Sequence, residues 1–327
     1  MTLHTLHALL DDGQRLDAEY RGALSSHLPM ALIALQRLGA GDARLAAFAA
    51  TYAQRLHTAP SPVPWPAGEP WAAHLGDPQA WPAYRGLFRE WFAHEGAERL
   101  LWQVLPVLMR GAGAAAFHGL LRTAYAVTAD HAGELTDGLA YWACRWFTCG
   151  APAGAGRSDD PAALLARLVL AVPERGLIAE RMALAAKQPA FARAADALRI
   201  DGIDAQHTLP RLAQLAAERY AIGGDFAVLH LVTSTHAMRV LLPWLDDDDH
   251  AAALAHYWRA YAAAWATASR RRLPPAPLRA WPEIVAIACA SDDDHLIKLV
   301  DSCREHEAAD GGALWRGAAS RAVTAAP

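Results

Sequence analysis

The chain has 327 residues, a hydrophobic content of 54% and a formal net charge of -4 at pH 7. This composition can supply a sizeable core, and it gives no reason to expect nucleic acid or an anionic membrane as a partner. No run of about 18 apolar residues occurs, which argues against a membrane span. The four cysteines fit neither a zinc ribbon nor a disulfide framework, and the N-terminus lacks a secretory signal. We therefore expect reduced thiols and a cytoplasmic location.

Apolar residues recur at helical spacing along nearly the whole chain, and almost no segment alternates as a strand does. We predict an all-α fold, a single large multi-helix domain over residues 1–327 whose helices pack around a central site. A Gly, Ala, Pro and Ser-rich stretch at residues 151–160 is the best candidate for a subdivision. The alanine-rich tail, residues 307–327, is expected to be partly frayed.

The first predicted helices cover residues 16–37 and 42–57, separated by a glycine-rich helix stop, and a proline-rich irregular connection follows over residues 58–76. Within the first helix, His27 comes two residues before Pro29, where a helix begins or kinks. A side chain at such a break is often aimed inward. His27 is therefore a candidate site residue.

The next predicted helices carry a second histidine and an aromatic stripe. A helix over residues 81–109, interrupted near Pro106, precedes one that starts at residue 116 and carries His118 with Arg122 one turn later. By itself, His118 is more often a hydrogen-bonded core histidine than a ligand. The helix over residues 134–148 places Tyr141, Trp142 and Trp146 on an aromatic stripe. Such a stripe is usually core, but it could equally form the floor of a pocket for a flat substrate.

Helices are expected over residues 161–172, 175–187, 191–198 and 208–220, and residues 226–239 form another that carries His230 and His236. Two residues six apart on a regular helix differ by about 120° in direction. One of these histidines is therefore expected to have a primary role and the other a secondary one. The acidic run at residues 246–249 begins the next helix and the basic run at residues 270–272 ends it, as the helix dipole favours.

The stretch at residues 291–300 holds one of only two lysines, Lys187 and Lys298. Ser291 is a good N-cap, three aspartates occupy the first turn, and His295 lies three residues before Lys298 on the same helix face. Burial among apolar residues would lower the pKa of Lys298 and leave some neutral amine, which can react with carbon dioxide to give a metal-ligating carbamate. The alternative is a lysine at the helix edge that reaches water.

Four histidines thus occupy apolar helical surroundings, and one has a lysine beside it. Imidazole suits iron, zinc, copper and nickel, and a carboxylate-like ligand added to several histidines favours a non-haem iron site or a related transition-metal site. The sequence has no His-Glu-x-x-His and no Gly-x-Ser-x-Gly motif, so zinc protease and serine hydrolase chemistry lack support.

Taken together, these stretches resemble the questin oxidase-like family. The resemblance is carried by Ser26-His27, Ala116-Phe117-His118-Gly119-Leu120, His230-Leu231-Val232-Thr233 and His295-x-x-Lys298. It implies an oxygen-dependent oxidoreductase, a mono- or dioxygenase, that acts on an aromatic or polyketide-like small molecule with non-haem iron or another transition metal. It also implies these metal ligands: His27, His118, His230, His295 and a carboxylated Lys298. The chain departs from the fungal pattern at Ser26 and Arg122, and these departures concern the substrate more than the metal.

The remaining candidate roles follow from position. Arg122 and His236 are predicted to be catalytic or substrate-contacting, and His236 is an alternative ligand if His295 faces away. The pocket wall is predicted from Tyr141, Trp142 and Trp146. Two other interpretations stay open: an NADPH-dependent Baeyer-Villiger-type oxidase without protein-bound metal, and a non-enzymatic helical binding protein whose histidines form core hydrogen bonds.

Overall fold

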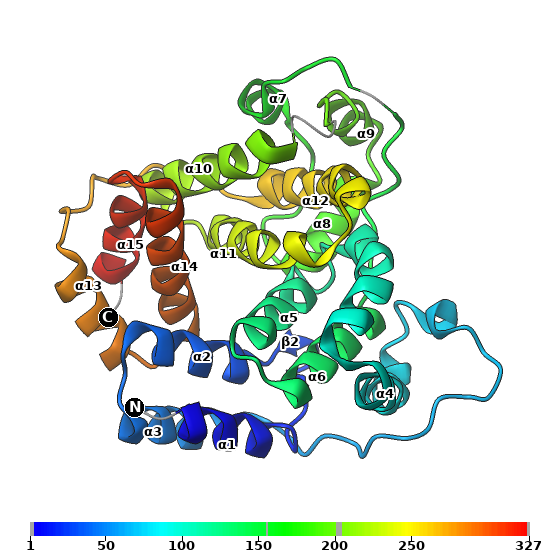
Figure 1. Ribbon diagram of the computed structural model, residues 1–327. Coiled ribbons are helices and arrows are strands. Elements are labelled where there is room, and N and C mark those ends of the chain that lie inside the picture. Colours follow the sequence, from blue (N-terminus) through cyan, green and yellow to red (C-terminus); the bar gives the residue numbers. More distant parts are fainter. Residues whose placement is uncertain (1–2, 155, 201–204, 326–327) are drawn as a thin grey trace.

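The computed structural model describes residues 3–154, 156–200 and 205–325, and within these ranges the fold is all-α, as predicted (Figure 1). The first half contains α1 (Leu3–Gly13), β1 (Glu19–Tyr20), β2 (Leu24–Ser25), α2 (Leu28–Leu38), α3 (Asp42–Ala53), α4 (Trp81–Leu108), α5 (His118–Thr128) and α6 (Ala132–Cys144). The second half contains α7 (Pro161–Arg167), α8 (Ile178–Ala186), α9 (Pro189–Ala195), α10 (Ala205–Gly223), α11 (Phe226–Leu241), α12 (Asp247–Thr267), α13 (Trp281–Ala290), α14 (Asp294–Asp310) and α15 (Leu314–Ala325). Short 3-10 turns lie at Trp71–His74, Pro78–Ala80, Met109–Gly111 and Leu242–Trp244.

Helix α11 lies at the centre of the fold and packs against α5, α10, α12 and α14 (Figure 1). Nearly every residue from Ala227 to Met238 is buried, as expected of a helix that is covered on all sides. Helix α2 packs in turn against α5 and α14. The starts of α2, α5, α11 and α14 can therefore meet in the interior.

The hydrophobic core is continuous from Leu6 to Val323 and includes buried side chains from both sides of residues 151–160. The C-terminal tail also contributes to it, because Trp315 is 1% exposed and α15 continues to Ala325. Residues 315–323 therefore contain packed side chains, and the end of the tail, residues 326–327, lies outside the described residues. The alanines of the tail, which suggested a loose end, allow α15 to lie close against α14.

Several predicted helix boundaries were wrong, and the helix expected over residues 134–148 ends at Cys144, so Trp146 lies beyond it. Residues 16–26 form no helix, because Arg21, Gly22 and Ala23 all have positive φ and close an antiparallel hairpin in which Glu19 pairs with Ser25. Helix α4 is interrupted at Gly96, whose φ is 77°, and not at Pro106, which stays within the helix. Helix α12 ends at Thr267, so the basic run at residues 270–272 lies beyond it.

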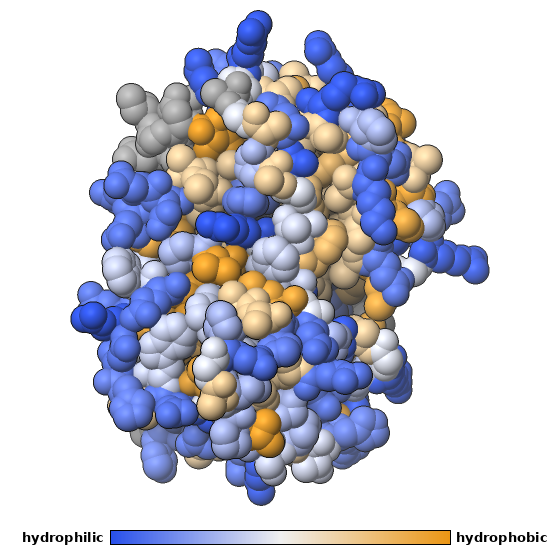
Figure 2. Space-filling model, turned by 90° about the vertical axis from the view of Figure 1, so that its right-hand side faces the viewer, coloured by the Kyte–Doolittle hydropathy of each residue, from blue (hydrophilic) through white to orange (hydrophobic). Residues whose placement is uncertain are grey.

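One face of the molecule shows hydrophilic side chains around smaller apolar areas (Figure 2). Within the described ranges, no helix combines the length and the apolar character that a bilayer crossing requires.

Candidate functional site

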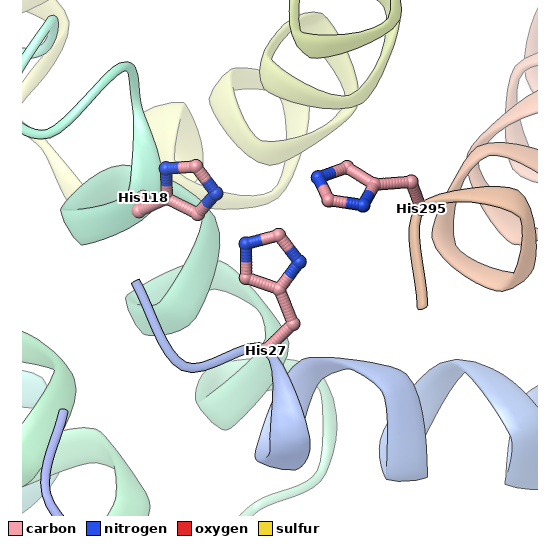
Figure 3. A group of neighbouring side chains, drawn as sticks. All are labelled: His27, His118 and His295. Carbon is pink, nitrogen blue, oxygen red and sulfur yellow. The ribbon is translucent and has the colours of Figure 1, made fainter. Parts of the chain in front are cut away.

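The four histidines that the sequence singled out lie next to one another. The ring centroid of His27 is 4.6 Å from that of His118 and 4.4 Å from that of His295. The ring of His230 adjoins this group, with its centroid 5.1 Å from His118 and 5.4 Å from His295. Figure 3 shows His27, His118 and His295 approaching one another from three separate elements, and one nitrogen of each lies within 4.8 Å of the others.

Each of these side chains lies at or near the start of a helix. His27 is the N-cap of α2, His118 is the first residue of α5, and His295 is the second residue of α14. His230 lies one turn into α11. Because the N-terminal end of a helix carries partial positive charge, the site favours anions and disfavours protonated imidazole.

The turn before α5 holds His118 in place at some cost in strain. Ala115, Ala116 and Phe117 all have positive φ, between 47° and 72°, a conformation that side chains other than glycine seldom adopt. This turn brings the carbonyl oxygen of Ala115 to 2.5 Å from His118 Nδ1. Strain of about 1–3 kcal/mol per residue is typical of segments that position functional groups.

The hydrogen bonds of His118 and His230 determine which ring nitrogen can bind a ligand. The Nδ1 atom of His118 donates to Ala115, and that of His230 donates to the carbonyl oxygen of Phe226, 2.8 Å away. Because a carbonyl only accepts, Nδ1 carries the proton in both rings and the Nε2 lone pair is free. His118 Nε2 is buried and has no hydrogen-bond partner among the described residues. An orphaned acceptor of this kind is typical of a ligand site.

Asp294 orients the other two rings. Its Oδ1 atom lies 2.6 Å from His27 Nδ1 and 2.7 Å from His295 Nδ1, and the residue is buried. Burial by itself would raise the pKa of this carboxyl, but the adjacent imidazole of His27 and the hydrogen bonds that His27 and His295 donate hold the pKa well below its usual range. Asp294 is therefore ionised and accepts from both rings, which leaves their Nε2 atoms for ligation.

Sequence reasoning missed this role of Asp294, which it counted among three aspartates that favour the helix dipole. Two signals could have found it. Asp294 directly precedes His295, and it lies four residues before Lys298, so it shares the buried face of α14 with that lysine.

Lys298 is buried beside His27, so the alternative in which it reaches water was wrong. The residue is 1% exposed, and its Nζ atom lies 2.9 Å from His27 Nδ1. Burial lowers the pKa of this amine to about 8, although the charges of Asp294 and Asp293 act in the opposite direction. A substantial fraction of the amine is therefore neutral slightly above neutral pH.

Three of the histidines, His27, His118 and His230, are also neutral. Burial, with the nearby Lys298 charge adding to it, lowers the pKa of His27 to about 3. Burial lowers the pKa values of His118 and His230 well below the ordinary range, and neighbouring histidines add to the shift. Neutral imidazoles keep the lone pair that a metal ion requires. The donor set, several such rings with one nearby carboxylate and a reactive amine, fits a transition-metal ion.

The two predicted catalytic residues lie outside this group of rings. Arg122 is buried in an ion pair with Glu134, and both line a cavity of about 10 Å³ beside Ser26. His236 is buried, and its ring centroid lies 5.8 Å from that of His306. Its direction on α11 therefore differs from that of His230, as the helix geometry indicated. The catalytic roles of Arg122 and His236 stay predictions.

The three predicted pocket residues have different surroundings. Tyr141 lines a cleft of about 300 Å³, and its hydroxyl lies 2.7 Å from Ser25 Oγ, two residues before His27. Trp142 is fully buried, and its Nε1 atom donates to Gly111. Trp146 is half-buried and donates to Val107. The structure thus places Tyr141 at a cleft and both tryptophans in helix packing, and a substrate pocket formed by the three stays a prediction.

Comparison with known proteins identifies one family. The model of the Questin oxidase-like family matches residues 24–303, a span that contains His27, His118, His230, His295 and Lys298. A search of curated proteins found no match.

Proposed function

Because the chain belongs to the questin oxidase-like family, we propose that it is an oxygen-dependent oxidase that uses a non-haem metal ion, iron in our proposal, to act on an aromatic polyketide-like molecule. Family membership supports the coarser statement, an oxidoreductase that acts on polyketide-like substrates. The metal is our addition. It is supported most by the buried and unpartnered Nε2 atom of His118, which lies beside two rings whose Nδ1 atoms are both engaged by Asp294.

The proposed ligands are the imidazoles of His27, His118, His230 and His295, with Lys298 supplying a carboxylate after modification. The neutral lysine amine attacks the carbon of carbon dioxide, and a carbon–nitrogen bond forms as one carbon–oxygen π bond opens and places negative charge on oxygen. The nitrogen then releases one proton to water, which leaves a carbamate. The pKa of about 8 favours this reaction, because the neutral amine is present near neutral pH. The four helix starts favour the resulting negative charge.

A bound iron ion would supply the electron-transfer chemistry that activates dioxygen towards an organic substrate. The chain itself keeps His27, His118 and His230 neutral, holds the four rings in one tautomer, and buries most of the site. Asp294 holds His27 and His295, while two backbone carbonyls hold His118 and His230. Rings fixed in this way lose little freedom when a metal binds.

Metal analysis of the purified protein tests the proposal. We expect about one transition-metal ion per chain, with occupancy that rises when bicarbonate is supplied during loading. Lys298→Arg cannot form the carbamate and should lose most of the metal. Lys187→Arg is the matched control, because it replaces the other lysine of the chain, and it should keep wild-type occupancy.

Absence of a transition metal from the wild-type protein, with and without bicarbonate, would contradict the proposal. Full occupancy in Lys298→Arg would retain a histidine site but reject the carbamate. A protein without metal that still oxidises a substrate with NADPH would support the Baeyer-Villiger-type alternative.

A further inference from the structure

Phe226 is an exposed aromatic residue in direct contact with the histidines. Its side chain is 54% exposed, and within the described ranges Phe226 and Trp102 are the aromatic members of the exposed large hydrophobic residues. Its ring centroid nevertheless lies 4.9 Å from that of His230 and 4.6 Å from that of His295. One part of the phenyl ring thus covers two imidazoles, and the other part faces solvent.

The backbone holds Phe226 firmly in this position. It is the first residue of α11, and the carboxylate of Asp225 caps the helix by accepting from the backbone N–H groups of Ala227 and Val228. The carbonyl oxygen of Phe226 accepts the Nδ1 proton of His230. The ring is therefore attached to a rigid helix start and not to a free loop.

The same side of the site is its most accessible side. His27, His118, His230 and Lys298 are each at most 6% exposed, whereas the side chain of His295 is 22% exposed. Phe226 contacts this more accessible histidine. A ligand that approaches His295 from solvent therefore meets the phenyl ring.

We infer that Phe226 is the stacking surface at the entrance of the site, where a flat aromatic substrate lies against the exposed part of the ring with its edge next to His295. This inference rests on the proposed function. Aromatic rings favour offset-stacked or edge-to-face contacts with centroids 4.5–7 Å apart. A ring held against Phe226 would lie close to the imidazoles and would displace water from both apolar surfaces. Phe226 would then be a positioning residue that selects flat aromatic substrates.

Binding of 2-naphthol, a flat hydroxylated aromatic probe, tests the inference by isothermal titration calorimetry on metal-loaded and metal-free protein. Phe226→Ala should weaken binding about 3- to 10-fold, the range expected for one lost aromatic stacking contact. Phe226→Trp should keep the affinity within about twofold. Trp102→Ala removes an aromatic side chain that is 51% exposed and should leave binding unchanged.

A second measurement locates the probe. Bound 2-naphthol should slow the modification of His295 by diethyl pyrocarbonate, followed by mass spectrometry, in the wild-type protein and not in Phe226→Ala. Because Phe226 is largely exposed, these variants are expected to fold, and circular dichroism checks that they do.

The inference is overturned if the wild-type protein does not bind the probe, or if Phe226→Ala binds the probe as tightly as the wild-type protein. It is also overturned if Trp102→Ala weakens probe binding as much as Phe226→Ala does. Metal content separates this failure from failure of the proposed function. If Phe226→Ala has the metal content of the wild-type protein and also binds the probe equally well, only the stacking surface is rejected. If the wild-type protein contains no metal but Phe226→Ala still weakens probe binding, the metal is rejected and the stacking surface is retained.

Discussion

Replacement of Asp294 by asparagine removes the acceptor that His27 and His295 share. In the wild-type protein one carboxylate oxygen lies 2.6 Å and 2.7 Å from the two Nδ1 atoms. Asparagine keeps one oxygen that can lie between the two rings, but this oxygen is uncharged and is a weaker acceptor than a carboxylate, and the amide group can only donate. Both rings are then held less firmly and can rotate or change tautomer.

Loss of a hydrogen-bonding carboxylate behind a metal-ligating histidine typically lowers metal affinity about 10- to 100-fold. That range corresponds to about 1.4–2.7 kcal/mol of binding free energy. We expect a loss within it for Asp294→Asn, because two of the proposed ligands depend on the same oxygen.

Competition against a chelator, with Co²⁺ or Fe²⁺ under anaerobic conditions, measures this change. Asp292→Asn is the matched control, because Asp292 is an exposed aspartate on the same stretch whose carboxylate pairs with Arg44 and not with a histidine. It should bind metal as tightly as the wild-type protein. A folded Asp294→Asn that also keeps wild-type affinity would refute the role of Asp294.

Three further predictions concern pH and packing. Metal occupancy at a fixed bicarbonate concentration should rise between pH 6.5 and 8.5, because the amine of Lys298, with a pKa near 8, must be neutral to form a carbamate; equal occupancy at both ends of that range would argue against it. Burial lowers the pKa of His306 from 6.5 to about 4, so the unfolded state binds more protons between these values and the free energy of unfolding falls as pH drops. In urea unfolding, the decrease in the free energy of unfolding from pH 7 to pH 5 should be about 2 kcal/mol smaller for His306→Gln than for the wild-type protein. An unchanged pH dependence would contradict this prediction. Gly119→Ala places a methyl group 2.7 Å from the Cα atom of Trp142 and should destabilise the protein by about 1–3 kcal/mol. Gly317→Ala, which has open space around the added methyl group, should not destabilise it. Equal melting temperatures for these two variants would contradict the close packing of α5 on α6.

Helical periodicity was sufficient to predict the all-α fold and the approximate positions of most helices, because each helix buries an apolar face. It failed where backbone conformation decides. The hairpin before α2 depends on positive φ at Arg21 and Ala23, residue types that seldom adopt it, so Gly22 between them was the one local signal of the turn. Gly96, not Pro106, interrupts α4, because the backbone has a φ of 77° there, a conformation that glycine adopts readily.

The candidate site was predictable in part. His27 and Lys298 were noticeable in the sequence, one beside a helix start and the other as a rare lysine in an apolar run, and the structure brings them within 2.9 Å. The role of Asp294 was hidden, because an acid in the first turn of a helix already has an ordinary explanation. Contact of Phe226 with His295 joins residues from two distant helices, and no spacing along the chain indicates such a contact.

Anomalous diffraction from crystals of the iron-loaded protein, recorded on both sides of the iron absorption edge, tests the central claim most directly. The proposed site predicts one strong anomalous peak about 2 Å from the Nε2 atoms of His27, His118, His230 and His295, with density for a carboxylated Lys298 beside it. Well-ordered rings with no anomalous peak between them, or a peak bound elsewhere on the chain, would contradict it.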